Sequence, residues 1–309
     1  MAHDQEAPAS AWLQPGEASP QQFAGLNWVT AGRRSARTIG VAIILIPLPS
    51  CDFDPTESGV PWQLLRRRGH RVVFATPDGK PAEADAKTLD GRGLGPFAAL
   101  LRADANGRSA YEDMTRSREF RHPIPYPDIR GTQVDALVLP GGHAPGMRPY
   151  LESDWLQRLI AEMFEQGRPV GAICHGVLLV ARSKNQTGRS VLRGRRTTGL
   201  TRFMELSGWA LTRFNVGDYY RTYPMTVEDE VRSLLARPDD FVRGPFAWRR
   251  DTPTRPDHGF AVRDGSYVSA RWPGDAHCFA AQFADVVAAY DSNRAAVSIS
   301  SSPREERAD

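Results

Sequence analysis

Lysine and cysteine are both scarce in this chain of 309 residues. Three lysines are found among 39 basic residues, which nearly balance 36 acidic ones to a net charge of +3. The arginines are scattered, without the basic stripe and interleaved aromatic residues of a nucleic-acid binding protein. Three dispersed cysteines are too few for a disulfide framework or a zinc knuckle. We therefore expect no nucleic-acid partner and a reducing, cytoplasmic location.

Long apolar runs and cofactor motifs are also lacking. No stretch approaches the roughly 18 consecutive apolar residues of a membrane helix, and residues 1–25 lack the apolar run of a secretory signal peptide. A phosphate-binding loop, a Gly-x-Gly-x-x-Gly fingerprint and metal-ligand spacing are not found. Hydrophobic residues still make up 41% of the chain, which is enough for a packed core. We expect a soluble protein with no membrane partner, no metal and no cofactor.

Apolar runs alternate with helical patterns through most of the chain. Continuous runs rich in β-branched residues predict four buried strands, and amphipathic patterns predict helices between them. The strands are expected at 39–46, 71–75, 135–139 and 170–173, and the helices at 61–68, 154–165 and 177–182. This alternation predicts an α/β fold with a parallel sheet covered by helices on both faces.

Four segments depart from this alternation. Residues 1–36 and 292–309 are poor in apolar residues and predict a flexible N-terminal arm and a flexible tail. Insertions at about 80–130 and 210–258 are long, polar and aromatic. We expect them to form caps or lids at one end of the sheet, because structureless loops of that length are uncommon unless they are functional. Within the second insertion, residues 218–223 are unusually aromatic.

The strongest chemical signal is the sequence Ala-Ile-Cys-His-Gly at the end of the fourth expected strand. A sharp strand-to-helix turn would present Cys174 at the carboxyl end of the sheet, where ligands bind. The start of the next helix adds positive potential, so we expect a lowered pKa for the thiol. His175 could exchange a proton with the sulfur if its ring folds back. A buried structural cysteine is the alternative, but strand, Cys-His-Gly and helix together favour a nucleophile.

Two further positions allow a structural and a chemical interpretation. Gly141 and Gly142 precede His143 after the third strand, where backbone N–H groups could bind an oxyanion, or the glycines could simply form a tight turn. Glu57 follows the first strand. It could complete a capping box that begins at Asp54, or it could hold a carboxyl group near the thiol for proton transfer. Spacing alone leaves both alternatives open for Glu57.

Taken in order, these motifs resemble the ThiJ/PfpI superfamily, over roughly residues 38–290. The resemblance is carried by a Glu after the first strand, Thr-Pro-Asp-Gly at 76–79, Leu-Pro-Gly-Gly-His at 139–143 and the Cys-His-Gly turn. It implies a class I glutamine-amidotransferase-like fold, with a flavodoxin-like parallel sheet in a single domain at 37–291. It also implies a homodimer.

Within the superfamily the chain is most similar to the glutathione-independent glyoxalase (glyoxalase III) and heat-shock chaperone branch. This similarity implies that Cys174 is the nucleophile, His175 its basic partner and Glu57 the family's glutamate. Residues 197–205 resemble the segment whose acidic residue orients the histidine, which makes Glu205 the candidate third member. A surface carboxylate on a helix is the alternative for Glu205. Arg271 could line the pocket, although residues 269–277 depart from the family's usual loop and Asp275 could cap the last helix.

The function implied by this resemblance is an enzyme that acts on a small reactive carbonyl. The Cys174 thiolate would add to a 2-oxoaldehyde such as methylglyoxal, and proton transfers would yield a 2-hydroxy acid such as lactate. This is the chemistry of a glutathione-independent glyoxalase, or D-lactate dehydratase-type lyase. The alternatives are a stress chaperone or redox sensor of the same fold, and a thiol-dependent hydrolase or hydratase.

Overall fold

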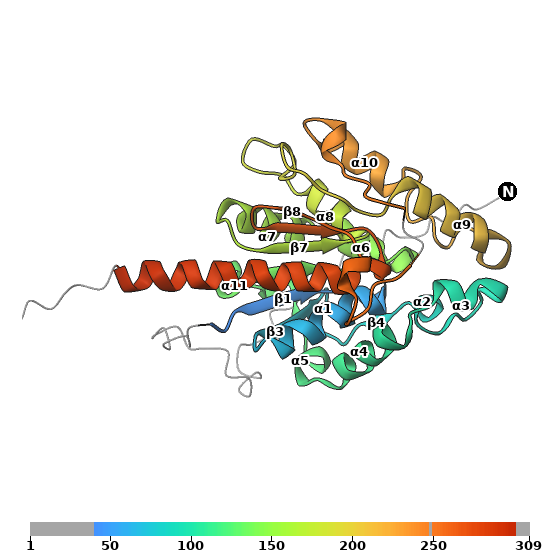
Figure 1. Cartoon of the computed structure of the whole chain (residues 1–309), viewed down its shortest axis with the longest axis horizontal. Helices are drawn as coiled ribbons and strands as arrows, with labels where there is room; N and C mark the ends of the chain where they lie inside the picture. Colours follow the sequence, from blue (N-terminus) through green and yellow to red (C-terminus); the bar gives the residue numbers. More distant parts are fainter. Residues whose placement is uncertain (1–39, 247–248, 301–309) are drawn as a thin grey trace, which may run out of the picture. The chain divides into compact units, whose positions relative to one another are not determined.

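A computed structural model describes residues 40–246 and 249–300 (Figure 1). Its centre is a seven-stranded sheet in the order β5-β3-β1-β6-β7-β9-β8. All neighbouring pairs are parallel except β8 and β9, which are antiparallel. The strands are β1 (Ile43–Pro47), β3 (Arg71–Thr76), β5 (Ile124–Pro125), β6 (Ala136–Leu139), β7 (Val170–Ile173), β8 (Ala261–Asp264) and β9 (Tyr267–Ala270). The sheet confirms the predicted α/β class, and it contains all four strands expected from apolar runs.

Helices pack over this sheet and bury its central strands. The helix pairs in contact include α1 with α11 and α7 with α8 (Figure 1). Their bounds are α1 (Pro55–Arg67), α6 (Arg148–Leu151), α7 (Asp154–Glu165), α8 (Gly176–Arg182) and α11 (Ala276–Ser300). Strands β6 and β7 are buried along their whole length, as a strand covered on both faces must be. Within the described ranges, no helix is both long enough and apolar enough to cross a membrane.

Helix α1 begins earlier than its sequence pattern suggested. We expected a start at Pro61, but Asp54 caps the helix through hydrogen bonds from the N–H groups of Thr56 (2.8 Å) and Glu57 (3.0 Å). Pro55 occupies the first turn, where its missing N–H costs nothing. The early start places Glu57 in the first turn of the helix, directly after the end of the β1 region.

The two insertions contain short helices rather than open loops. The first contains α2 (Ala86–Asp90), α3 (Ala98–Leu101), α4 (Ala105–Arg116) and α5 (Arg118–Arg121), and its strand β4 (Glu83–Ala84) pairs with β2 (Cys51–Phe53). The second contains α9 (Arg202–Val216) and α10 (Val227–Leu234). Short 3₁₀ turns complete the described chain: Gly95–Phe97, Tyr126–Asp128, Gly131–Gln133, Pro145–Met147, Pro238–Asp240, Pro256–His258 and Pro273–Asp275. Helix α9 contacts the turn at Gly95–Phe97, so the two insertions meet.

Part of the predicted C-terminal tail is helical. The expected N-terminal arm, residues 1–36, lies outside the described residues. The expected tail begins inside α11, which continues past residue 292 to Ser300. Arg294 explains part of this extension, because its guanidinium pairs with Asp291 (3.3 Å) and with Asp135. The helix is therefore anchored beyond the predicted boundary.

Candidate active site

Cys174 lies at a strained turn between β7 and α8. Its φ of 56° is in the left-handed region, which residues other than glycine rarely adopt. The turn is held from both sides: the N–H of Cys174 donates to the carbonyl of Ala270 (3.1 Å), and Gly176 packs against β6. A Cβ at Gly176 would lie 2.1 Å from the carbonyl oxygen of Leu139. The Cys-His-Gly order therefore has a steric basis, and it fixes the thiol at the carboxyl end of the sheet.

Glu57 reaches this thiol from the first turn of α1. Its Oε2 accepts a hydrogen bond from the N–H of Gly141 (2.8 Å). A Cβ on Gly141 would lie 2.9 Å from both Glu57 Oε2 and Cys174 Cβ, so both side chains crowd this glycine. The capping box is incomplete, because the N–H of Asp54 donates to the carbonyl of Gly141 and not to Glu57. The structure thus brings Glu57 together with Cys174.

The electrostatics of this pair differ from our expectation of a low thiol pKa. Burial raises the pKa of Cys174 well above its usual value, and the negative charges of Glu57 and Asp54 act in the same direction. Burial, followed by the charge of Asp54, likewise raises the pKa of Glu57. The helix N-terminus does not outweigh these effects. Because two acidic groups in one buried site resist ionising, this environment favours the protonated forms of both.

The imidazole of His175 is oriented by a hydroxyl group. Its Nδ1 lies 3.6 Å from Cys174 Sγ, and its Nε2 lies 3.3 Å from Thr222 Oγ1. The Thr222 hydroxyl donates to the carbonyl of His143, which can only accept. The same hydroxyl oxygen must then accept from His175 Nε2–H. Neutral His175 therefore carries its proton on Nε2 and directs the lone pair of Nδ1 at the sulfur.

A second imidazole completes the immediate surroundings. The ring of His143 lies 4.9 Å from that of His175 and 5.4 Å from that of Tyr220, edge to face in both cases. Burial lowers the pKa of His143 to about 4 and that of His175 well below its usual value. One ligand atom each from His143, Cys174 and His175 lies within 4.8 Å of the others. This set is compact enough for a soft cation, but the tautomer of His175 suits acceptance of a proton from the thiol, and we assign it that role.

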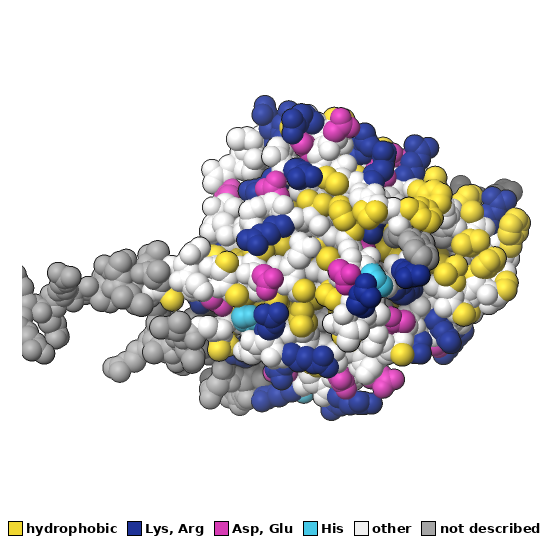
Figure 2. All heavy atoms as spheres, in the orientation of Figure 1, with side chains coloured by type: hydrophobic (Ala, Val, Ile, Leu, Met, Phe, Trp, Pro, Cys, Tyr) yellow, Lys and Arg dark blue, Asp and Glu magenta, His cyan; other side chains and the backbone are white. Residues whose placement is uncertain are grey.

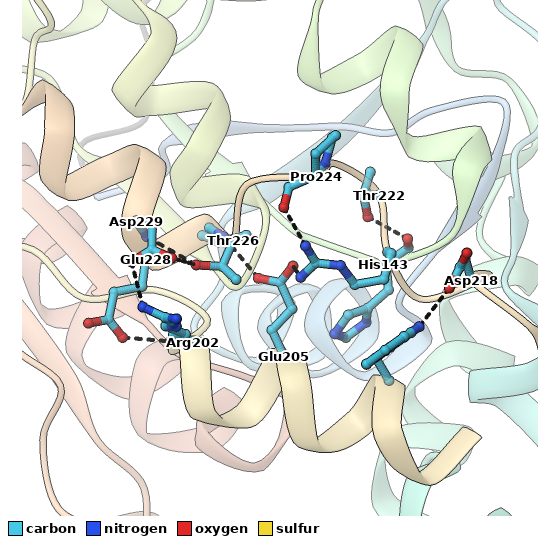
Figure 3. A network of polar contacts seen from close by, with 12 residues as sticks. His143, Arg202, Glu205, Asp218, Thr222, Pro224, Thr226, Glu228 and Asp229 are labelled. Atoms are coloured by element: carbon cyan, nitrogen blue, oxygen red, sulfur yellow. Dashed lines mark hydrogen bonds and ion pairs between the residues drawn. The ribbon is translucent and has the colours of Figure 1, made fainter. Parts of the chain in front are cut away.

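Glu205 lies away from His175. It is 2% exposed, and it accepts hydrogen bonds from Arg221 Nη1 (3.1 Å) and the N–H of Val227 (2.9 Å). Figure 3 shows this carboxylate below the loop that carries Thr222. Thr222, and not Glu205, is the residue bonded to the far side of His175. The two are linked through the chain, because Arg221 precedes Thr222.

The remaining predicted residues have structural partners. Arg271 is 2% exposed and pairs with Asp275 (2.8 Å), and its Nη1 donates to the carbonyl of Pro245 (2.5 Å). Asp275 also accepts from the N–H of Phe260, so it ties Arg271 to a loop. The N–H of Gly141 is engaged by Glu57 and is not free for an oxyanion while that bond persists. The structure places Gly142 beside this position, and its proposed oxyanion role stays a prediction.

Sequence reasoning missed Thr222 and Tyr220. Both belong to residues 218–223, the segment singled out for its aromatic content, but nothing local in that pattern points to His175. The contact joins residues 47 positions apart. Figure 3 shows Thr222 directed at the backbone of His143, which brings this loop over the carboxyl end of β6.

Comparison with known proteins identifies the family. The sequence model described as ThiJ/PfpI family-like matches residues 48–245, so the chain belongs to this family. An uncharacterised protein from Schizosaccharomyces pombe is 32% identical over 46% of this chain, which spans 53% of that relative. Deglycase PfpI from Pyrococcus furiosus is 23% identical over 76% of this chain and 94% of its own length.

A solved structure shows the same fold. Glyoxalase III from Candida albicans superposes with a TM-score of 0.58 at 18% identity, covering 80% of this chain and 98% of that structure. The likeness agrees with a mostly parallel sheet flanked by helices, which is the class predicted from the sequence.

Proposed function

We propose that this protein is a cysteine-dependent, cofactor-free enzyme that converts a small 2-oxoaldehyde, such as methylglyoxal, into the corresponding 2-hydroxy acid. The observation that carries this proposal is the meeting of Cys174, His175 Nδ1 and Glu57 at the strained end of β7. The names of two proteins similar to this chain, a deglycase and a glyoxalase III, support action on reactive carbonyl compounds.

In the proposed reaction, the Cys174 sulfur adds to the aldehyde carbon as its proton passes to His175 Nδ1 or Glu57. A hemithioacetal results. His175 then takes the proton from the aldehyde carbon and returns it to the neighbouring carbon through an enediol, while Glu57 exchanges protons with the oxygens. Water cleaves the resulting thioester and restores the thiol. The aldehyde carbon is oxidised and the ketone carbon is reduced, so the net change is addition of one water molecule.

Access to the sulfur requires movement. Cys174 is fully buried, whereas His143 is partly exposed. Tyr220 and Thr222 cover His143 from the second insertion. We infer that substrate enters when this loop shifts, and that closure then excludes water from the enediol.

The test is lactate formation from methylglyoxal without glutathione. Wild-type protein is expected to form lactate, Cys174→Ala to form none above buffer, and the matched cysteine control Cys51→Ala to retain activity. Cys51 is exposed and is not part of the described site. Equal rates for wild type and Cys174→Ala would contradict the proposal.

A second candidate function is client binding by a stress chaperone. Four large apolar side chains on α9 and the second insertion are exposed: Phe203, Phe214, Met225 and Phe246. Figure 2 shows apolar side chains gathered over α9, and exposed patches of this kind mark interaction surfaces. Suppression of client aggregation that survives Cys174→Ala but falls in Phe203→Ser/Phe214→Ser would support it. Unchanged aggregation with the wild-type protein would reject it.

A further inference from the structure

The hydroxyl of Tyr220 has no role in the site described so far. Tyr220 is 6% exposed, and within the described residues its hydroxyl has no hydrogen-bond partner. Its ring is nevertheless held firmly, against His143 at 5.4 Å and against Tyr219 at 5.3 Å. A buried polar group without a partner is uncommon in native proteins and calls for an explanation.

A complementary group lies on the first insertion. Asp85 is 1% exposed, and its Oδ2 also has no partner among the described residues. Its Oδ1 is fixed by the N–H of Lys87 (2.9 Å) and by the hydroxyl of Tyr219 (3.3 Å). Tyr219 joins the two groups, because its ring packs against the ring of Tyr220 and its hydroxyl bonds Asp85. The protein thus leaves one buried donor and one buried acceptor unpaired in the same neighbourhood.

Aromatic contacts connect Tyr220 to the residues around the sulfur. His143 contacts Tyr220 on one side and His175 on the other, and His175 contacts Cys174 Sγ. Glu57 Oε1 is a third buried oxygen without a partner in the described part of the chain. Tyr220 thus packs on His143, one of the two imidazoles beside the sulfur.

We propose that Tyr220 Oη and Asp85 Oδ2 form a subsite for a hydroxyl group on the substrate carbon next to the dicarbonyl. A hydroxyl both accepts and donates, and so matches a phenol donor and a carboxylate acceptor. This inference rests on the proposed function and narrows its substrate class to 2-oxoaldehydes hydroxylated at the third carbon. The simplest is 3-hydroxy-2-oxopropanal, which differs from methylglyoxal by one hydroxyl group. Addition of water would give glycerate in place of lactate, and the third-carbon hydroxyl takes no part in the redox change.

The experiment compares kcat/KM for these two aldehydes. Wild type is expected to favour 3-hydroxy-2-oxopropanal by roughly 10- to 100-fold, because methylglyoxal would leave both buried groups unpaired. Tyr220→Phe should lose most of that preference, because its kcat/KM for 3-hydroxy-2-oxopropanal falls far more than its kcat/KM for methylglyoxal. The matched control is Tyr223→Phe, whose hydroxyl instead bonds Glu152 (2.8 Å) and Arg182 (3.0 Å). An equal fall for both aldehydes, or no preference in wild type, would overturn the subsite.

A binding measurement separates this inference from the proposed function. Calorimetry with glycerate and lactate needs no turnover, and these acids differ by the same hydroxyl group. Glycerate is expected to bind wild type about tenfold more tightly than lactate does. Tyr220→Phe is expected to bind the two acids with equal affinity. If neither aldehyde is turned over but glycerate keeps this advantage, the enzymatic proposal fails and the subsite stands. If the two acids bind alike to wild type, the subsite is wrong whatever the activity.

Discussion

The position of the Glu57 carboxyl group depends on two neighbours, Asp54 and Gly141. Asp54 takes over the capping of α1, which leaves the Glu57 carboxyl group for Gly141 and the thiol. Its charge is one of the causes that raise the pKa of Cys174, second to burial. Glu57→Gln replaces that charge by a neutral amide of the same shape. We therefore expect the thiol pKa to fall in this variant, while carbonyl turnover falls about 100-fold or more because a proton donor and acceptor is lost.

The measurement for Glu57→Gln is thiolate absorbance near 240 nm as a function of pH. Subtracting the same titration of Cys174→Ala removes the signals of Cys51 and Cys278. The midpoint of the difference curve is expected at lower pH in Glu57→Gln than in wild type. A midpoint that stays in place or moves upward would show that the carboxyl group does not destabilise the thiolate.

The sequence predicts the members of the site that are fixed by local geometry. Cys174 and His175 follow from the strand, the turn and the helix around them. The steric reason for Gly176, the approach of Leu139, is visible only in the structure. The sequence left two roles open for Glu57, helix capping and proton transfer. The hydrogen bonds of Gly141 to Glu57 and Asp54, which exclude the capping box, are visible only in the structure. Thr222 could not be predicted, because its contact depends on how a long insertion folds back over β6. Our choice of Glu205 relied on resemblance, and the structure instead pairs this carboxylate with Arg221.

At the scale of elements, the loop between α9 and α10 connects Glu205 to the active site. Glu205 binds Arg221 and the N–H of Val227 at the start of α10, and Arg221 Nη2 also donates to the carbonyl of Pro224. These bonds fix the backbone on both sides of Thr222. We infer that Glu205 is a positioning residue that acts on His175 through this loop; Figure 3 shows the loop with Glu205 and Thr222.

A double-mutant cycle tests this link. Thr222→Val should lower kcat about 10- to 100-fold with little change in KM, because the buried His175 Nε2–H loses its acceptor. Thr222→Ser keeps the hydroxyl and should therefore keep kcat near the wild-type value. Glu205→Gln should also lower kcat, but have little further effect in the Thr222→Val background. Burial raises the pKa of Glu205 to about 7. Its ion pair therefore weakens as pH falls through 7, and Glu205→Gln should remove that part of the kcat–pH profile. Fully additive effects would contradict the link.

The same reasoning explains which elements the sequence predicts. Strands β1, β3, β6 and β7 are continuous apolar runs, because helices cover both faces of the sheet. The small helices of the first insertion carry mixed polarity and owe their positions to contacts with distant elements, such as α4 against α1. The end of α11 was misplaced for a similar reason: its composition suggests a tail, but Arg294 is held by Asp135 at the start of β6.

At the scale of the whole molecule, buried acids make stability depend on pH. Burial raises the pKa of several carboxyl groups: Asp54 to about 6, Asp85 to about 6, Glu205 to about 7 and Asp251 to about 8. The folded state then binds more protons than the unfolded state between about pH 4 and these values. Each group therefore lowers the free energy of unfolding as pH rises through that window.

Asp251 provides the clearest case because it lies outside the site. It is 1% exposed, its Oδ2 accepts from the N–H of Cys278 (2.7 Å), and its Oδ1 has no partner among the described residues. Asp251→Asn keeps an acceptor for that N–H and removes the ionisation. The wild-type free energy of unfolding is expected to fall between pH 5 and 8. The free energy of unfolding of the variant should fall less, and the difference between the two falls should be on the order of several kcal/mol. Urea unfolding at four pH values measures the difference.

The matched control for Asp251→Asn is Asp78→Asn, at an exposed turn beside Lys80 (3.1 Å). Its pKa is lowered by hydrogen bonds from Lys80, so its removal should leave the fall between pH 5 and 8 unchanged. Parallel curves for wild type and Asp251→Asn would mean that the Asp251 carboxyl ionises in the folded protein as it does in the unfolded chain. Convergence of the two curves near pH 4, with wild type losing stability above it, is the pattern that burial of an acid requires, since protonated Asp251 carries no charge to desolvate.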